Sequence, residues 1–398
     1  MRRIKLLLVA VLLLNLFHPL EQQAVAQNLV FPCDGGGTYS VSSGTLIGTN
    51  GCRGKVNVSP TVVAIGTGAF RYSSGITEIL IPNSVTSIRP SAFYGVEMES
   101  IVIPRSVTKI WGFAFKDAKI NLITILNSEI EFDTLVFEGA TISSVVLPNS
   151  LQKIEDGLFL ESNLMSIVIP NSVNSIGHSA FKSTKLKSIV IPNSVTSIGD
   201  NAFLLSSLES VTLGNSLSRV GRGVFAGTQL TSVVIPNSMT TIPELMFQST
   251  PLKSITIPSS VVSIEDGAFR GSKLASIYLP ISVKSISAFA FMDMPNLRVV
   301  GIPDTVLEVS DQAFVDSNPT SILYCGSLKI TSPYSAKISL AVSCKTENEK
   351  LALVAAAQAD FNQKLINPKT TITCVKGKLS KKVTAVKPKC PSGYKVKK

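Results

Sequence analysis

Few residues of this sequence have the types and spacing that catalysis requires. There are only two histidines, His18 and His178, and the two adjacent acid pairs, Glu155-Asp156 and Glu265-Asp266, lie far apart in the chain. A run of three glycines at 35–37 precedes a stretch rich in Thr and Ser, not a helix, so it does not match a phosphate-binding loop. We therefore predict no catalytic residues, no cofactor and no metal site, and a protein that is not an enzyme.

The six cysteines fall into three neighbouring pairs. Pairing each cysteine with its nearest neighbour predicts the disulfides Cys33–Cys52, Cys325–Cys344 and Cys374–Cys390, and loop closure of this length stabilises a fold by about 3 kcal/mol per bridge. Other pairings stay open, because six cysteines do not fix their own connectivity. A zinc site is the alternative, but the sequence has no Cys-x-x-Cys motif and no companion histidine for it.

The first 26 residues have the features of a signal peptide. A basic start, Met1 to Lys5, is followed by an apolar run from Leu6 to Phe17 and by the small-residue cleavage signal Ala24-Val25-Ala26. A membrane anchor is the alternative, but the run falls short of the roughly 20 apolar residues that a spanning helix needs. We expect a secreted, extracellular protein with no transmembrane anchor after cleavage.

The formal net charge of +11 is concentrated at one end of the chain. Residues 345–398 contain 13 lysines and 3 acids, giving +10, whereas residues 27–344 contain 21 basic and 22 acidic side chains, giving −1. The basic balance is therefore a property of the tail. It does not indicate that the rest of the protein binds nucleic acid.

A repeat of 22 residues organises most of the chain. In one unit the apolar positions are Leu186, Ile189, Ile191, Val195 and Ile198, around the wording Ile-Pro-Asn-Ser-Val-Thr-Ser-Ile. Each of twelve units has a phenylalanine at the same position. These are Phe70, Phe93, Phe115, Phe137, Phe159, Phe181, Phe203, Phe225, Phe247, Phe269, Phe291 and Phe314.

Each unit is expected to form one coil of a stack. The Leu-x-x-Ile-x-Ile segment predicts a short strand that ends at proline, which lacks an N–H for a continuing ladder. A turn at Pro-Asn-Ser, a second extended segment and a one-turn helix capped by Asp200 should follow. Because one coil cannot enclose its apolar face, successive coils must stack with the phenylalanines in a column. The fold class is therefore a mainly β repeat solenoid of about 12 units.

The repeat resembles the BspA-like leucine-rich repeat family, through Leu-x-x-Ile-x-Ile-Pro-x-Ser-Val-Thr-Ser-Ile-Gly-x-x-Ala-Phe, over Ser59 to Tyr324. The resemblance implies a right-handed solenoid, exported or displayed at the cell surface, that serves protein binding and adhesion without a catalytic site. Many members have a cysteine three residues after the Phe. Here small residues such as Ala118, Ser162 and Thr184 occupy that position, which suits an oxidising compartment.

We predict the following organisation: 1–26 signal peptide, 27–58 N-terminal cap, 59–326 leucine-rich repeats, 327–345 C-terminal cap, 346–366 amphipathic helix, and 367–398 a Lys-rich, disulfide-closed tail. The helix is expected from Thr346 and Glu349 as a capping box and from apolar residues at helical spacing. Its expected use is docking on the solenoid end, with self-association as the alternative.

The tail lysines are candidates for binding an anionic surface. Lysine without arginine favours point-charge attraction, for example to an anionic cell-wall polymer, over bidentate phosphate recognition, and one tail tyrosine gives little capacity for stacking on nucleic acid. The alternative is that they only keep the protein soluble. These lysines are Lys376, Lys378, Lys381, Lys382, Lys387 and Lys389.

Outward strand positions are the candidate ligand-binding surface, on the concave strand face. One column is mostly serine and a second is β-branched, with Glu78, Leu80, Tyr278 and Arg298 as exceptions that could carry specificity. The alternative is that such residues only suit a well-paired strand. The candidates are Ser100, Ser144, Ser166, Ser188, Ser210, Ser232, Ser254, Ser276, Tyr278 and Arg298. Trp111, the single tryptophan, is a further possible contact, or packs against Phe113.

Together these observations predict an exported, non-enzymatic protein that mediates protein or glycan binding and adhesion at the cell surface. A structural spacer of the envelope is the alternative. A wall-active enzyme is less supported, because no cluster of acids, histidines or cysteines is evident.

Overall fold

The computed structural model describes residues 28–317 and 319, together with four strands at 321–324, 370–376, 379–385 and 395–396. Contacts within the chain group these residues into two compact units. Unit 1 comprises residues up to Leu151 together with Leu158–Leu164, and unit 2 comprises Gln152–Gly157 and the residues from Met165 onward. The described repeats form a β solenoid of about 12 turns, which confirms the predicted fold class.

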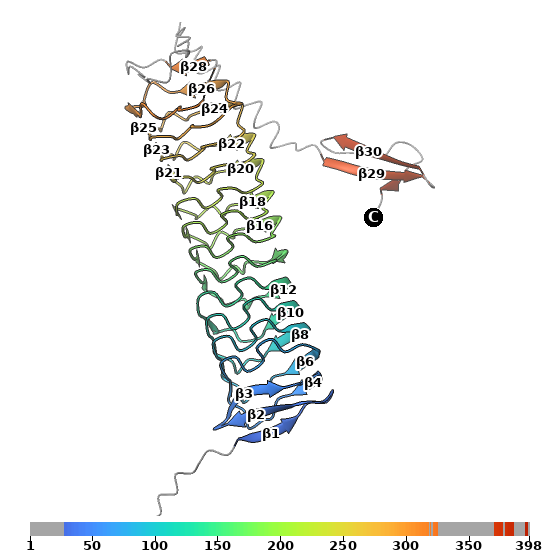
Figure 1. Cartoon of the computed structure of the whole chain (residues 1–398). Coiled ribbons are helices and arrows are strands. Elements are labelled where there is room, and N and C mark those ends of the chain that lie inside the picture. The colour runs from blue at the N-terminus through green and yellow to red at the C-terminus, as the bar shows by residue number, and fades with distance from the viewer. Residues whose placement is uncertain are drawn as a thin grey trace, which may run out of the picture. The chain divides into compact units, whose positions relative to one another are not determined.

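Unit 1 begins with an antiparallel cap that leads into parallel ladders (Figure 1). The cap strand β3 pairs in parallel with the first short repeat strand, so the cap continues the solenoid sheet. The cap strands are β1 (Leu29–Pro32), β2 (Thr38–Ser42) and β3 (Thr45–Asn50). The short repeat strands are β5 (Ala64–Ile65), β7 (Ser87–Ile88), β9 (Lys109–Ile110) and β11 (Glu131–Phe132). The longer strands are β4 (Gly54–Asn57), β6 (Ile76–Leu80), β8 (Glu97–Ile103), β10 (Lys119–Ile125) and β12 (Thr141–Val146).

Unit 2 repeats this pattern with shorter strands, and equivalent residues of successive coils are register partners. One set comprises β14 (Ser166–Ile167), β16 (Ser188–Val190), β18 (Ser210–Thr212), β20 (Ser232–Val234), β22 (Ser254–Thr256), β24 (Ser276–Tyr278), β26 (Val299–Ile302) and β28 (Ser321–Tyr324). The other comprises β13 (Lys153–Ile154), β15 (Ser175–Ile176), β17 (Ser197–Ile198), β19 (Arg219–Val220), β21 (Thr241–Ile242), β23 (Ser263–Ile264), β25 (Ser285–Ile286) and β27 (Glu308–Val309).

The Lys-rich tail contains an antiparallel hairpin. Strands β29 (Thr370–Lys376) and β30 (Leu379–Ala385) pair along their whole length. A third strand that the sequence did not indicate, β31 (Lys395–Val396), pairs with the other edge of β29. The predicted helix at 346–366 lies outside the described residues. So do Cys325, Cys344 and Cys390, and the pairs Cys325–Cys344 and Cys374–Cys390 therefore stay predictions.

The phenylalanine column forms the core of each unit, as predicted. In unit 1 the rings from Phe70 to Phe159 stack with centroid separations of 4.9–5.4 Å. In unit 2 the rings from Phe181 to Phe314 stack with separations of 5.2–6.1 Å. All of these side chains are buried. Each ring therefore packs against the equivalent ring of an adjacent coil, as the need to cover apolar surface demands.

The segment around each phenylalanine is not the short helix that the sequence predicts. It consists of hydrogen-bonded turns, and the described part of the chain contains no helix. Asn201 and Leu205, on either side of Phe203, have φ values of 57° and 58°, which a right-handed helix does not allow. The Phe203 N–H donates to the carbonyl of Val224 in the next coil at 3.0 Å. Bonds between coils thus replace the bonds within a helical turn.

Asp200 has a different role from the predicted helix cap. Its Oδ1 accepts a hydrogen bond from the Arg222 N–H of the next coil at 2.8 Å. Asp156 does the same for the His178 N–H at 2.9 Å. Side chains in this column therefore satisfy backbone donors of the following coil, which adds to the registration of the stack.

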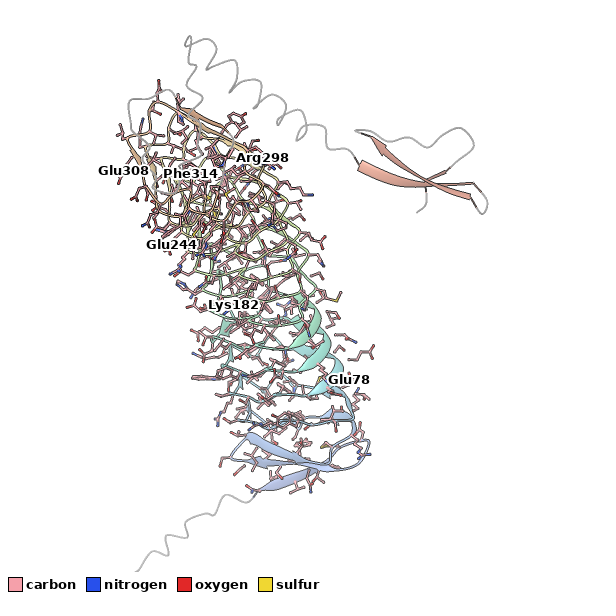
Figure 2. The ribbon with its side chains drawn as sticks, turned by 45° about the horizontal axis from the view of Figure 1, so that its top comes forward. Glu78, Lys182, Glu244, Arg298, Glu308 and Phe314 are labelled. Atoms are coloured by element: carbon pink, nitrogen blue, oxygen red, sulfur yellow. A yellow bond between two sulfur atoms is a disulfide. The ribbon has the colours of Figure 1, made fainter. Side chains whose placement is uncertain are left out.

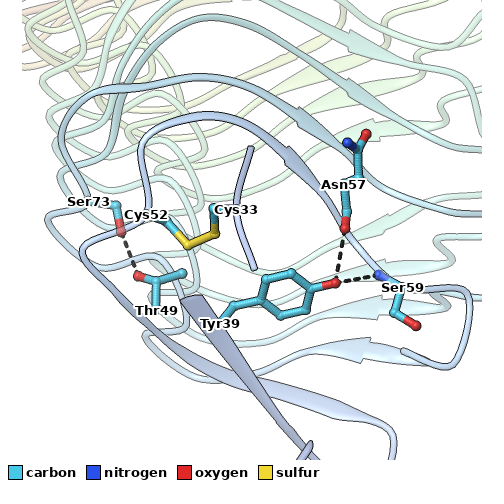
Figure 3. The surroundings of a disulfide bond; sticks show 7 residues. All are labelled: Cys33, Tyr39, Thr49, Cys52, Asn57, Ser59 and Ser73. Carbon is cyan, nitrogen blue, oxygen red and sulfur yellow. Dashed lines mark hydrogen bonds between the residues drawn. A yellow bond between two sulfur atoms is a disulfide. The ribbon is translucent and has the colours of Figure 1, made fainter. Parts of the chain in front are cut away.

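A disulfide and a buried tyrosine hold the N-terminal cap together (Figure 3). Cys33 and Cys52 form the predicted disulfide, and both are buried. The Tyr39 hydroxyl donates to the carbonyl of Asn57 at 2.9 Å and accepts from the Ser59 N–H at 2.8 Å. Burial raises the pKa of Tyr39, although the hydrogen bond from Ser59 opposes this. The cap thus covers the first coil and ties it to the strands before it.

No helix suited to crossing a membrane occurs among the residues that the structure describes, and the predicted signal peptide at 1–26 lies outside them.

We predict that Phe203→Ala lowers the free energy of unfolding by about 3–5 kcal/mol, because the cavity removes contacts with rings on both sides. Leu205→Ala is the matched control, since Leu205 lies in the same turn but is 60% exposed; we expect it to change the free energy by about 0.5 kcal/mol or less. Urea unfolding followed by circular dichroism measures both. Equal urea midpoints for the two variants would show that the phenylalanine column does not determine the stability of the fold.

Candidate functional site

The outward positions of the longer strands form one surface in each unit, which we call the strand face. In unit 2, Ser188 is the register partner of Ser210, and Val190 of Thr212. The residue between them, Ile189, is 4% exposed and points into the core. Alternation along the strand thus turns each serine and each β-branched residue outward.

Aliphatic side chains on the strand face are unusually exposed. In unit 2, Val168 is 81%, Val190 64% and Val234 49% exposed. In unit 1, Val102 and Val146 are 50% and 49% exposed. Single exposed valines need no explanation, but a column in which valines recur between threonines such as Thr212 leaves apolar surface in water that a partner could cover. The strand face therefore combines an apolar stripe with a column of hydroxyl groups.

The serine candidates occupy these strands, with differences between the units. In unit 1, Ser100 and Ser144 are half-buried on either side of Leu122, which takes the serine position in β10. In unit 2, Ser254 is half-buried, and the other candidates are exposed. These are Ser166, Ser188, Ser210, Ser232 and Ser276.

Arg298 does not belong to either strand-face column, contrary to the sequence interpretation. Ser276 pairs with Val299 and Tyr278 with Gly301, so Arg298 is displaced by one residue from the serine column. Tyr278 does lie in its column. Its ring covers Gly301, where an added Cβ would approach Tyr278 Cδ1 to 2.6 Å. Figure 2 shows Arg298 on the side of the longer strands, away from Glu244 and Glu308.

Charged groups near the strand face are paired between coils. Lys55 of β4 lies 3.1 Å from Glu78 of β6, and Lys187 lies 2.5 Å from Glu209. Exposed pairs of this kind contribute about 1 kcal/mol or less. Within each pair the two charges neutralise each other. Glu78 is therefore engaged within the stack, while the other sequence exception, Leu80, is 43% exposed.

The acids and the histidine that could have served catalysis are turn residues. Glu155 accepts from Lys153 at 2.5 Å, and this bond raises the pKa of Lys153. His178 Nδ1 accepts from the Asp200 N–H at 3.0 Å. Among the described residues, no group of three or more His, Cys, Asp or Glu side chains could hold a metal ion.

A second cluster, in unit 1, was missed by sequence reasoning. Tyr72 and Tyr94 form an edge-to-face pair with ring centroids 5.0 Å apart and an angle of 90° between the rings. The Arg71 guanidinium carbon lies 5.2 Å from the centre of the Tyr72 ring and 4.8 Å from that of Tyr94. A signal was available, because Tyr72 lies two residues after Phe70 and Tyr94 one residue after Phe93, in consecutive repeats.

Comparison with known proteins identifies the repeat. The family model described as "BspA type Leucine rich repeat region" matches residues 54–162, 130–250 and 219–339. No curated protein matches the chain. Among solved structures, a leucine-rich repeat protein from Bacteroides ovatus is 23% identical, with a TM-score of 0.50, covering 76% of this chain and 94% of that one. This likeness supports the fold.

Two other solved structures are similar over comparable lengths. A leucine-rich cell surface protein from Faecalibacterium prausnitzii is 23% identical, covering 76% of this chain and 97% of that one, with a TM-score of 0.43. The pneumococcal vaccine antigen PcpA is 18% identical, covering 75% of this chain and 88% of that one, with a TM-score of 0.45.

We predict that spectrophotometric titration detects one tyrosine, Tyr94, with a pKa of about 12. The hydrogen bond with Tyr72 is the largest cause of this high pKa. A hydrogen bond with Asp117 is the second, and the negative charge of Asp117 also disfavours the Tyr94 phenolate. The pKa of Tyr72 is lowered by hydrogen bonds from Tyr94 and Arg71, so Tyr72 ionises first. In Tyr72→Phe we expect the pKa of Tyr94 to fall toward 10, the ordinary tyrosine value. An unchanged titration curve in that variant would contradict the coupling.

Proposed function

This chain belongs to the BspA type leucine-rich repeat family, and on that premise we propose that it is an exported, non-enzymatic adhesion protein whose strand face binds a protein ligand. The observation that carries this proposal is the column of exposed valines beside the column of serines. The family supports a role in protein binding or adhesion. The location of the ligand on the strand face is our own inference.

The chemistry of the strand face favours a protein ligand over a glycan. Its repeated positions in β16 and β18 offer methyl groups and hydroxyls but neither aromatic rings nor charges. Interface cores between proteins are apolar and depleted of charged residues, with polar groups at the rim. A ligand lying along the strands would bury valine side chains such as Val190 and form hydrogen bonds with the adjoining serines.

The stack also keeps the strand face in shape before a ligand arrives. Each outward residue follows or precedes a buried one, such as Ile189 or Val233, and backbone bonds join each coil to the next. Binding then needs little ordering of the backbone. Preorganisation of this kind raises affinity because less conformational entropy is lost on association.

We predict that Val190→Lys combined with Val234→Lys weakens ligand binding at least tenfold, because lysine ammonium groups would be desolvated at an apolar contact. Both side chains already point to solvent, so folding should be retained. The assay applies the mature chain to intact cells and to an array of purified extracellular proteins and glycans.

The matched control is Leu205→Lys combined with Ile281→Lys, which adds the same two charges at similarly exposed positions in turns. We expect this control to bind like the wild type. If the valine variant and the control variant bind equally well to every target, the strand face is not the ligand site.

We further propose that the tail retains the protein on an anionic envelope polymer. Six lysines carry the attraction: Lys376, Lys378, Lys381, Lys382, Lys387 and Lys389. Point-charge attraction is screened by salt. Attachment through these groups should therefore weaken as ionic strength rises.

Changing these six lysines to glutamine should release the protein from cells into the medium at low salt, whereas changing them to arginine should preserve attachment because the charge is kept. Cell fractionation in low and high salt measures both. Salt-insensitive attachment of the glutamine variant would contradict retention by the tail, and a protein found only in the cytoplasm would contradict export.

A further inference from the structure

We propose that unit 1 has a second binding surface, distinct from the strand face, that receives an acidic segment of a polypeptide. We call this surface the aromatic edge and define it by Arg71, Tyr72, Tyr94, Trp111 and Phe113. These residues flank the phenylalanine turns of consecutive coils.

The centre of the aromatic edge is an arginine held against two tyrosine rings. Tyr72 and Tyr94 meet at 90°, and the guanidinium carbon of Arg71 is within about 5 Å of both ring centres. Contact of this kind occupies a face of the guanidinium. One of its N–H groups interacts with the Tyr72 hydroxyl, which leaves the other N–H donors at its edges for a ligand. Among the described residues Arg71 forms no ion pair.

The fold fixes the exposed ring of Tyr72 in place. The Tyr72 N–H donates to the carbonyl of Tyr94 in the next coil at 2.8 Å. The ring lies over Gly95, where an added Cβ would come within 2.5 Å of Tyr72 Cδ1. Tyr72 is nevertheless 61% exposed. Tyr72 is therefore a positioned aromatic surface that faces solvent.

Two more exposed rings lie just before Phe115, in the coil that follows Tyr94. Trp111 and Phe113 are 39% and 38% exposed. Lys109 Nζ lies 4.5 Å from the Trp111 ring centre, and Lys116 Nζ lies 5.3 Å from that of Phe113.

Of the three cations at the aromatic edge, Arg71 forms no ion pair among the described residues, whereas both lysines have acidic partners. One further acid, Asp117, interacts with the Tyr94 hydroxyl. Lys109 lies 2.9 Å from Glu131, and Lys116 lies 2.9 Å from Glu138. The hydrogen bonds that the two lysines donate to these glutamates raise the pKa of both lysines. An incoming carboxylate would therefore pair with the planar guanidinium of Arg71, which can donate to both carboxylate oxygens at once.

The residue types favour a polypeptide as the partner. Trp, Tyr and Arg are the side chains most enriched among residues that dominate protein interfaces. The aromatic edge is distributed over adjacent coils about 4.8 Å apart, which suits an extended chain. Small sugars are usually enclosed in concave pockets, whereas these rings lie on an outer edge. The partner would place a carboxylate at Arg71 and an apolar or aromatic side chain on Tyr72.

The experiment follows the fluorescence of Trp111, which is the single tryptophan of the chain and belongs to the aromatic edge. The mature full-length protein is titrated with a Glu-Tyr copolymer. We expect a saturable change in emission, at least tenfold weaker in Arg71→Ser. Arg270→Ser is the matched control, since Arg270 holds the same repeat position beside Phe269; it should behave like the wild type. Both variants keep the Lys-rich tail. Any binding of the copolymer to the tail is therefore the same in both and does not affect the comparison between them.

Two further arms make the result decisive. Poly-glutamate should give a weaker response than the copolymer, because it lacks the group that packs on Tyr72. Polygalacturonate carries carboxylates on a sugar backbone and should give little response; an equal response would identify a glycan site and overturn the proposal.

An equal affinity for Arg71→Ser and Arg270→Ser would also overturn it. Arg71→Lys keeps the charge without the planar fork and should give an intermediate affinity, and thermal melts show that each variant is folded. The Val190→Lys, Val234→Lys protein should keep the full Trp111 response, so failure of the strand-face proposal would be distinguishable from failure of this one.

Discussion

The structure depends on the fact that no single coil can bury its own apolar face. A coil of this length turns one phenylalanine inward, and that ring is covered only when another coil lies against it, as Phe203 is covered by Phe181 and Phe225. Backbone bonds between coils follow from this contact, including bonds from the phenylalanine turns themselves. Stacking then forces equivalent residues of successive repeats into columns. Every surface of a unit is consequently a set of columns whose chemistry is fixed by the repeat.

This constraint explains how a repetitive sequence can form a surface that binds a ligand. A column of valines or serines offers the same weak contact many times, in a spacing that the core holds constant. Departures from the column, such as the tyrosines at positions 72 and 94, concentrate stronger interactions at one place. The two surfaces differ accordingly. The repeated positions of the strand face offer hydroxyls and methyl groups, whereas the aromatic edge has a guanidinium among rings that forms no ion pair in the part of the chain that the structure describes. The net charge of the protein belongs to neither, because it resides in the tail.

Much of the fold could be predicted from the sequence because periodicity reports burial directly. The phenylalanine column, the strands ending at proline and the Cys33–Cys52 bridge are all present. The helix expected near Asp200 was wrong, because left-handed residues such as Asn201 redirect the backbone toward the next coil, and residue types alone do not reveal φ. The placement of Arg298 was wrong because one late step, from the repeat of Phe291 to that of Phe314, is 23 residues long and shifts the register by one. The Arg71 cluster was missed because side-chain directions in such turns cannot be read from spacing.

The central claim is that the strand face of the stack contacts the ligand, and hydroxyl-radical footprinting of the protein bound to its target cells tests it most directly. The account predicts that Val168, Val190 and Val234, all exposed in the free protein, become protected from oxidation, while the equally exposed Leu205 and Ile281 in the turns do not. Protection of Leu205 and Ile281, with the three valines oxidised as in the free protein, would contradict the account.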